Sequence, residues 1–181
     1  MSSDGLLTVN ADSSLPGISF DESKFRQILG KFATGVTVVT MLNDEGQLSG
    51  LTASSFNSLS LDPPLILVCV SYQARSYKHL RNRQEFAVHI LDADQAPVAR
   101  RFAVSGGEKS AACDWHVNER GFPILSRFHA VMECRLHQEY EGGDHAIIVG
   151  RVQRLYGHAD AGDPLLFYQG QFFPLVRDGD N

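Results

Sequence analysis

The sequence predicts a mainly β domain with a few short helices, in which the strands close into a barrel. Short runs rich in β-branched and apolar residues recur along the chain, among them 36–41, 65–70 and 86–91. Polar or glycine-containing turns separate these runs, and the strands do not alternate with helices as a parallel nucleotide-binding sheet requires. Closure is expected because it removes exposed strand edges.

Length and composition indicate one compact domain. The chain has 181 residues, 43% hydrophobic and 20% charged, and residues 1–18 lack periodicity. We therefore predict a flexible N-terminal tail over 1–18 and a single domain over 19–177. A net charge of -5 argues against nucleic acid as a partner. No apolar run approaches the roughly 20 residues that cross a membrane and no secretory signal is evident, so we expect a cytoplasmic protein.

The N-terminal half is predicted to contain one helix and three strands. The spacing of Ser19 and Glu22 resembles a capping box, and apolar residues then recur at helical intervals until Gly35 ends the helix. A strand over 36–41, a hairpin loop over 43–47 and a strand over 48–56 follow. Prolines interrupt the pattern at 63–64, and the run 65–70 is apolar enough to lie in the core.

The C-terminal half is predicted to be mostly β. We expect a short helix over 76–82, a strand over 86–91 and a helix capped by Asp94. Alternation of apolar and polar residues predicts a half-buried strand over 130–136, paired through Gly142 and Gly143 with a strand over 145–156. A last short strand over 172–176 brings the total to six or seven.

The cysteines and histidines indicate neither a disulfide nor a metal site. Cys69, Cys113 and Cys134 are far apart and odd in number, which favours free thiols, and the seven histidines show no metal-ligand spacing. We expect no metal and no catalytic cysteine.

The most unusual segment is Gly50–Pro64, which concentrates small hydroxyl and amide side chains between two apolar strands. Such groups, with accessible backbone N–H groups, can bind the edge of a flat heterocycle and the oxygens of a phosphate without filling the space that the ring needs. A polar loop at a strand end would have the same composition.

Three motifs carry a resemblance to a known family. The segments FATGVTVVT (32–40), GLTASSFNSLSLDPPL (50–65) and GDHAIIVGRV (143–152) resemble the flavin reductase family, and the similarity extends from about Phe25 to Leu175. The resemblance implies a split β-barrel of the FMN-binding type, and a homodimer with flavin at or near the subunit interface. It also implies an enzyme that reduces FMN or FAD with NADH or NADPH and delivers reduced flavin to a separate oxygenase.

The resemblance also implies a set of flavin-binding residues. It places the flavin against Thr52, Ala53, Ser54, Ser55, Ser58, Ser60, Cys69 and Val70, and its phosphate against Arg75, Ser76 and, as a weaker candidate, Arg101. Helix physics agrees for the phosphate, because a helix N-terminus offers unpaired N–H groups and a guanidinium offers two parallel donors. An ordinary solvated charge is the alternative for Arg75.

On the nicotinamide side the resemblance points to His145, which follows Gly143 and Asp144 at the start of a strand and is the catalytic-site candidate. An imidazole there can hydrogen-bond the nucleotide; the alternative is a turn histidine capped by Asp144. Tyr168 and Phe172 are implied to stack beside the site, although core packing would explain both. His89 and Gln171 depart from the family, which often has Asn and a basic residue at these positions.

Hydride transfer between nicotinamide and flavin needs correct placement of the two rings and no acid–base pair, which fits the lack of such a pair in the sequence. Two alternatives remain at this stage. One is a non-catalytic flavin-binding or redox-sensing module, and the other is a split-barrel oxidase of a B6-type substrate, which would require more basic groups.

Overall fold

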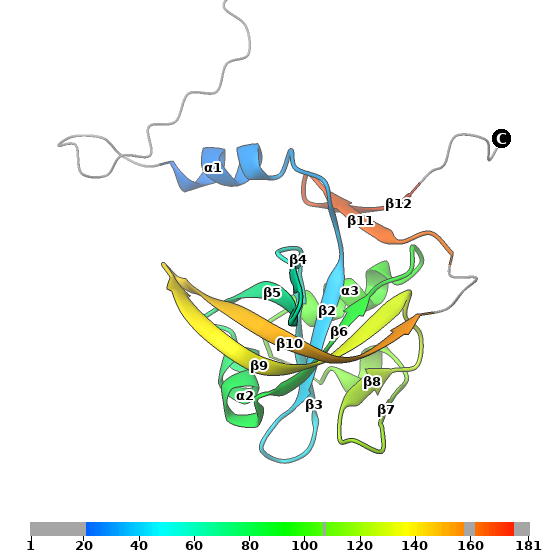
Figure 1. The fold of residues 1–181 in the computed structure, drawn as a ribbon. Coiled ribbons are helices and arrows are strands. Elements are labelled where there is room, and N and C mark those ends of the chain that lie inside the picture. Colours follow the sequence, from blue (N-terminus) through cyan, green and yellow to red (C-terminus); the bar gives the residue numbers. More distant parts are fainter. Residues whose placement is uncertain (1–20, 107, 158–161, 176–181) are drawn as a thin grey trace, which may run out of the picture.

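The computed structural model describes residues 21–106, 108–157 and 162–175, and its centre is one antiparallel sheet of seven strands. The strand order is β3-β2-β6-β9-β10-β5-β4, and the sheet is strongly curved (Figure 1). The strands are β2 (Thr37–Leu42), β3 (Leu48–Ala53), β4 (Asn57–Leu61), β5 (Pro64–Ser71), β6 (Glu85–Ile90), β9 (Ala130–Gly142) and β10 (His145–Gly157).

The sheet does not close. Strands β3 and β4 are its two edges, and within the described residues they do not pair with each other. The prediction of a fully closed barrel is therefore wrong, whereas the split β-barrel implied by the family resemblance agrees with this open, curved sheet. Edge exposure is limited at β3 because helices α2 and α3 both contact it.

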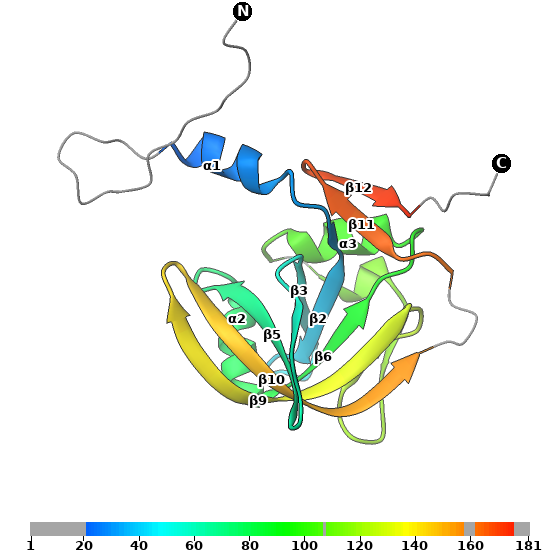
Figure 2. The same cartoon turned by 45° about the horizontal axis from the view of Figure 1, so that its top comes forward.

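Within the described ranges, three helices and two small sheets surround the main sheet. The helices are α1 (Glu22–Leu29), α2 (Arg75–Arg83) and α3 (Ala96–Ala103), with one 3₁₀ turn at Ser110–Ala112. Strands β1 (Thr34–Gly35), β11 (Leu165–Tyr168) and β12 (Gln171–Pro174) form one small sheet, and β7 (Trp115–Val117) pairs with β8 (Pro123–Leu125). Figure 2 shows α1 and the β11–β12 hairpin on the same side of the molecule, where Gln169 N–H donates to Gly30 O.

The core lies inside the curve of the main sheet. Strand β5 alternates strictly, with Ile66, Val68 and Val70 buried and the intervening residues partly exposed. A second cluster forms where α3 packs against β2 and β3 through Phe102. Gly50 permits this contact, because a Cβ there would lie 2.4 Å from Val39 O and 2.8 Å from the Phe102 ring.

The structure confirms most predicted elements and corrects several ends. The hairpin loop over 43–47 is present, with Asn43 N–H donating to Gln47 O. The strand expected over 48–56 ends at Ala53, and the polar residues beyond it form the separate strand β4. Five strands were not predicted, namely β1, β4, β7, β8 and β11. The predicted tail over 1–18 lies outside the described residues, as do both ends of the predicted domain.

The caps of two helices also differ from prediction. Helix α1 begins after Asp21, whose carboxylate accepts from Lys24 N–H, and it ends at Gly30 rather than Gly35. Ser19, the predicted capping residue, lies outside the described residues. Helix α3 begins after Gln95 rather than Asp94; the Gln95 side chain makes no cap hydrogen bond to the helix and instead accepts from Asp92 N–H.

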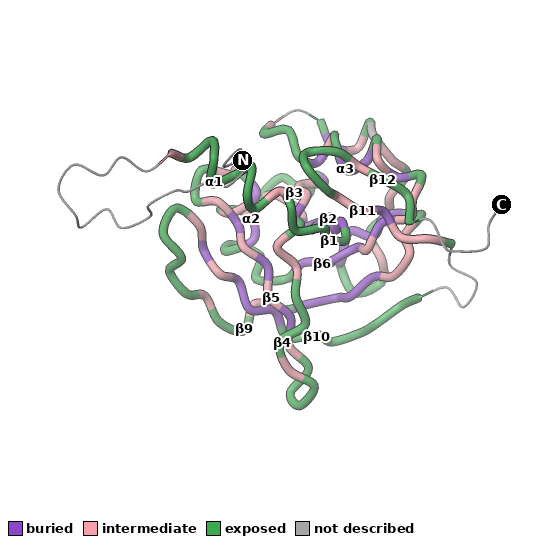
Figure 3. The backbone as a smooth tube through the Cα atoms, turned by 90° about the horizontal axis from the view of Figure 1, so that it is seen from above, coloured by how far each residue is buried: buried purple, intermediate pink, exposed green. Residues whose placement is uncertain are grey.

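Helix α1 is amphipathic but contributes nothing to the core. None of its residues is buried, and the whole helix is exposed (Figure 3). It lies apart from the main sheet (Figure 1). Ile28 is 37% exposed, Leu29 55% and the following Phe32 77%. No helix in the described part of the chain is long and apolar enough to span a membrane.

Candidate functional site

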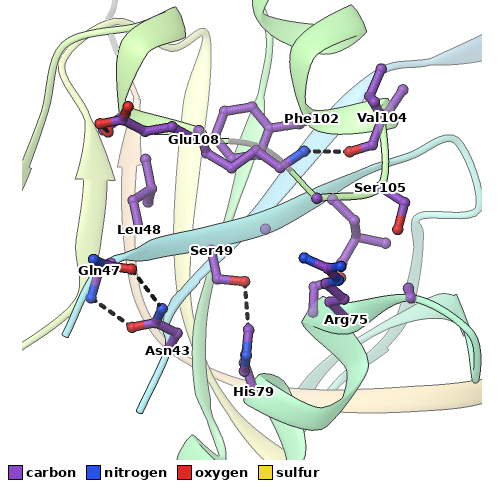
Figure 4. Close-up of a pocket in the computed structure, with 18 of the residues that line it drawn as sticks. Asn43, Gln47, Leu48, Ser49, Arg75, His79, Phe102, Val104, Ser105 and Glu108 are labelled. Carbon is purple, nitrogen blue, oxygen red and sulfur yellow. Dashed lines mark hydrogen bonds between the residues drawn. The ribbon is translucent and has the colours of Figure 1, made fainter. Parts of the chain in front are cut away.

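The described residues enclose a cleft of about 1170 Å³ beside the edge strand β3. Its floor is the first half of β3, from Leu48 to Leu51; one wall is the start of α2 and the other is the segment 102–110 that follows α3 (Figure 4). This volume is slightly above the usual range of about 300–1,000 Å³ for a small-molecule site. The cleft therefore has room for a ligand larger than a single ring system.

Arg75 and Ser76 lie together at one end of this cleft. They are the first two residues of α2, and the cap residue Ala74 provides no side-chain acceptor for the N–H groups of the first turn. The Arg75 guanidinium lies beside Gly106 of the opposite wall, 3.4 Å from where a Cβ on Gly106 would be. A helix N-terminus, a serine and an exposed guanidinium together make this end of the cleft suited to a phosphate.

The opposite wall is held by two basic side chains. Arg101 donates from Nε and a terminal nitrogen to Glu108 O at 2.9 and 2.6 Å, and the Lys109 ammonium donates to Arg101 O and Val104 O. Lys109 also lies 5.7 Å from the centre of the Phe102 ring, and burial lowers its pKa. In this structure the Arg101 guanidinium orders the wall and does not line the cleft.

The polar segment after β3 is held to its neighbours by hydrogen bonds. Thr52 Oγ1 donates to Ala99 O of α3 at 2.6 Å, and Ser55 Oγ accepts from Cys69 N–H at 2.9 Å and donates to Cys69 O at 3.3 Å. Ser55 thus connects the end of β3 to the middle of β5. These bonds fix a short surface of small side chains that continues the line of β3 beyond the cleft floor.

The other predicted flavin contacts are distributed around this segment. Ser54 and Ser58 are exposed, Ser60 and Cys69 are partly exposed, and Ala53 is buried beneath them. Val70 points to the other side of β5, where it is fully buried in the main core cluster. A contact of Val70 with a ligand therefore has to come from its backbone.

His145 begins β10 and pairs with Ser71, the last residue of β5. Its Nδ1 lies 2.7 Å from Asp144 Oδ1, and this hydrogen bond lowers the pKa of Asp144. The side chain is 42% exposed, and Tyr72 N–H donates to Asp144 O, which ties this turn to the segment leading into α2. His145 lies outside the cleft lining, near the α2 end of β5.

The C-terminal hairpin carries the two predicted aromatic residues. Tyr168 is 37% exposed, whereas the Phe172 ring packs 5.2 Å from Phe167 and has the Arg100 guanidinium 5.3 Å above it. Phe172 also contacts the core cluster around α3. Its packing role is thus visible in the structure, while Tyr168 presents a surface toward solvent.

The two departures from the family pattern have different surroundings. His89 is fully buried; its Nε2 accepts from Leu125 N–H at 3.1 Å and its Nδ1 lies 3.3 Å from Val38 O. Burial lowers the pKa of His89 to about 4, so the ring is neutral and its role is structural. Gln171 is exposed at the start of β12.

Sequence reasoning missed several residues that line the cleft. Ser49 Oγ lies 2.7 Å from His79 Nδ1 across the floor, and Lys109 and Trp115 lie on the opposite wall. No sequence motif marks them, because they come from four separate segments. Proximity in the folded chain was the only available signal.

The cysteines are free thiols, as predicted. Burial raises the pKa of Cys113, and it raises that of Cys134 to about 12, which keeps both protonated. Among the described residues no group of three or more His, Cys, Asp or Glu is arranged to hold a metal ion.

Comparison with known proteins assigns the class. Residues 29–175 match the flavin reductase like domain, and the chain belongs to this family. The structure superposes on the NADH:FAD oxidoreductase SgcE6 of Streptomyces globisporus, solved in complex with NAD and FAD fragments, with a TM-score of 0.82 and 38% identity. That alignment covers 88% of this chain and 96% of SgcE6.

Curated relatives share the same domain. The chain is 43% identical to the FMN reductase (NADH) SmoA of Agrobacterium fabrum, over 84% of this chain and 86% of SmoA. It is 37% identical to HsaB, the reductase subunit of a flavin-dependent monooxygenase of Rhodococcus jostii, over 94% and 86% of the two chains. The chain is also 44% identical to a probable flavin reductase of Rhizobium meliloti. That alignment covers 74% of this chain but only 43% of the relative's length.

Proposed function

We propose that this protein is an NADH-dependent flavin reductase that reduces FMN or FAD and supplies the reduced flavin to a separate monooxygenase component. The observation that carries the proposal is the continuity of two features along β3. The polar surface fixed by Thr52 and Ser55 continues directly into a cleft that begins at Arg75 and Ser76. This arrangement suits a flat ring that bears a phosphorylated side chain.

The residues fit such a ligand chemically. The small side chains at Ser54 and Ser55 leave space above the strand end, and backbone N–H groups there can donate to the carbonyl edge of a ring. Arg75 and Ser76 would hold the phosphate, and Lys109 adds positive charge to the opposite wall. Ser58, Ser60, Cys69 and the backbone of Val70 would complete the ring side.

When bound, the flavin accepts at N5 the hydride that a stacked nicotinamide releases from C4. The chain contributes placement and charge. Backbone donors at the strand end stabilise the negative charge that reaches the ring, and His145, oriented by Asp144, would hydrogen-bond the nicotinamide nucleotide. Tyr168 would cover the stacked rings from the C-terminal hairpin. No side chain has to accept or donate a proton in this scheme.

The flavin is proposed to be a released substrate rather than a permanent group. The cleft is only partly enclosed, and among the described residues its phosphate end offers the α2 N-terminus and two basic side chains. Moderate affinity is required if the reduced flavin is to leave for a partner oxygenase.

We further propose a homodimer, supported by the apolar face of α1. An eight-residue helix with no buried residue gains little stability alone. Within the described part of the chain, Leu29 and Phe32 remain more than half exposed. A second copy that covers this face would bring the α1 side of one subunit against its partner. Light scattering should give twice the monomer mass, and Phe32→Asp should lower it; a monomeric wild-type protein would refute this assignment.

The function is tested by steady-state oxidation of NADH and NADPH with FMN, with FAD and without flavin. We expect purified protein to accelerate nucleotide oxidation only when free flavin is added, with NADH preferred. Copurification of tightly held flavin without turnover would instead favour a flavin-binding module. The absence of any flavin-dependent rate above background with either nucleotide would refute the proposal.

A further inference from the structure

The cleft is longer than a flavin mononucleotide needs. Its phosphate end is at Arg75, but the cavity continues along β3 to Leu48 and to the β2–β3 hairpin at Asn43 and Gln47 (Figure 4). From Thr52 back to Leu48 the strand rises by about 13 Å at its usual rise per residue. A ligand with its ring beyond Thr52 and its phosphate at Arg75 leaves this distal part unfilled.

We propose that the distal part of the cleft binds the adenylate half of FAD, so that this reductase prefers FAD to FMN. The inference rests on the proposed function, since it places the flavin phosphate at Arg75. FMN ends at a single phosphate, whereas FAD continues into a second phosphate, a ribose and an adenine. The distal cleft lies where that continuation has to run.

Lys109 is placed to bind the second phosphate. Lys109 lines the cleft although it is only 7% exposed. Two of the three N–H groups of its ammonium donate hydrogen bonds to Arg101 O and Val104 O. Among the described residues the third has no acceptor, so it is available for a phosphate oxygen. The two backbone bonds hold the charge in position before a ligand arrives, which reduces the entropy lost on binding.

Trp115 and Ser49 define the space for the nucleoside. Trp115 is partly buried on the distal wall, where it packs against the cluster that contains Leu48, and an indole face is a suitable surface for a purine. Ser49 points across the floor toward His79, and its small side chain leaves the space above the floor unfilled. Together they leave a slot with one aromatic wall and a small polar floor.

Adenylate could also come from NADH, which carries the same group. The cleft is contiguous with the flavin side of the site, because its floor and the Thr52–Ser55 surface belong to one strand and its continuation. His145, the candidate for the nicotinamide side, does not line it. These positions favour FAD as the source, and the experiment below distinguishes the two.

The test uses a matched pair of substitutions at one position. Ser49→Leu fills the floor of the distal cleft, and Ser49→Ala removes the same bond to His79 without filling it. For the full-length wild-type protein we expect a lower KM and a lower Kd for FAD than for FMN. Ser49→Leu should raise the ratio of KM for FAD to KM for FMN at least tenfold, while Ser49→Ala should leave that ratio within twofold of wild type.

A second variant tests the same site without a steric change. Glu108 is exposed at the cleft rim, where its charge opposes a diphosphate. Glu108→Gln should lower the KM ratio of FAD to FMN about twofold at low ionic strength, the modest effect expected of an exposed charge. This variant gives an answer even if Ser49→Leu fails to fold, which circular dichroism would reveal.

The outcomes separate the possibilities. A wild-type protein that uses FMN as well as FAD, or a ratio that neither Ser49→Leu nor Glu108→Gln changes, overturns the inference. A rise in the KM for NADH in Ser49→Leu with both flavins, at an unchanged flavin ratio, assigns the cleft to the nicotinamide nucleotide and also overturns it. If the wild-type protein showed no flavin-dependent activity at all, the proposed function itself would be refuted.

Discussion

The buried His89 should make the stability of the protein depend on pH between about 6.5 and 4. Burial lowers the pKa of His89 from 6.5 to about 4, so the unfolded chain takes up a proton at a pH where the folded protein does not. The contribution of neutral His89 to the free energy of unfolding is fully present above pH 6.5 and is lost as the pH falls toward 4. The full difference of about 2.5 pKa units corresponds to roughly 3 kcal/mol, and between pH 7 and pH 5 the loss is about 2 kcal/mol.

Burial is the main cause of the lowered pKa of His89, and one hydrogen bond of the neutral ring would also be lost on protonation. Its Nε2 accepts from Leu125 N–H, and protonation would place a second donor against that N–H group. Urea unfolding at pH 7 and pH 5 measures the effect, with His89→Asn as the control because an amide can accept the same hydrogen bond but does not titrate. The wild type should lose about 2 kcal/mol more than His89→Asn over this range. Equal losses in the two proteins would refute the reasoning.

Three further predictions concern the site and the core. Arg75→Ala should raise the KM for flavin about tenfold with little change in kcat, because it removes a charge-assisted hydrogen bond to the phosphate. His145→Ala should mainly raise the KM for NADH in the same assay. Gly150→Ala should lower the free energy of unfolding in urea by about 1–3 kcal/mol, since its Cβ would lie 2.6 Å from the Phe86 ring in a packed core.

Each of these variants has a control in the same element or, for His145, in the neighbouring strand β9. Lys78→Ala changes another exposed cation of α2, and an equal effect on flavin KM would remove Arg75 from the phosphate site. His137→Ala changes an exposed histidine of β9; if it alters the KM for NADH as His145→Ala does, the assignment of His145 is lost. Gly157→Ala meets nothing within 4 Å, so equal destabilisation by both glycine variants would contradict the packing argument.

The sequence predicted the strands whose signals are local. The β-branched run that became β2 and the alternation in β9 both specify a strand whatever lies beside them. Strands β1 and β7 have only two or three residues and exist because a partner strand lies beside them. A single short segment carries no such information, which explains why these strands were missed.

The candidate site divides in the same way. The serines after β3 lie within one contiguous motif, and Arg75 and Ser76 are adjacent in the sequence, so the family resemblance could propose both sets. The distal cleft combines the β2–β3 hairpin, β3, α2 and the segment after α3, and no single stretch of sequence contains it. Arg101 shows what the sequence could not predict. Its guanidinium donates to the carbonyl oxygen of Glu108, seven residues along the chain, instead of lining the cleft.

The sequence by itself determined the family, the mainly β class and the polar strand end, because these are recorded in residue types at fixed spacing. Only the tertiary structure decided that the sheet stays open between β3 and β4, that His89 is a neutral core residue, and that a long cleft runs beside β3. The physical reason is that burial, ring protonation and cavity shape depend on which distant segments pack together. A short stretch of sequence does not contain that information.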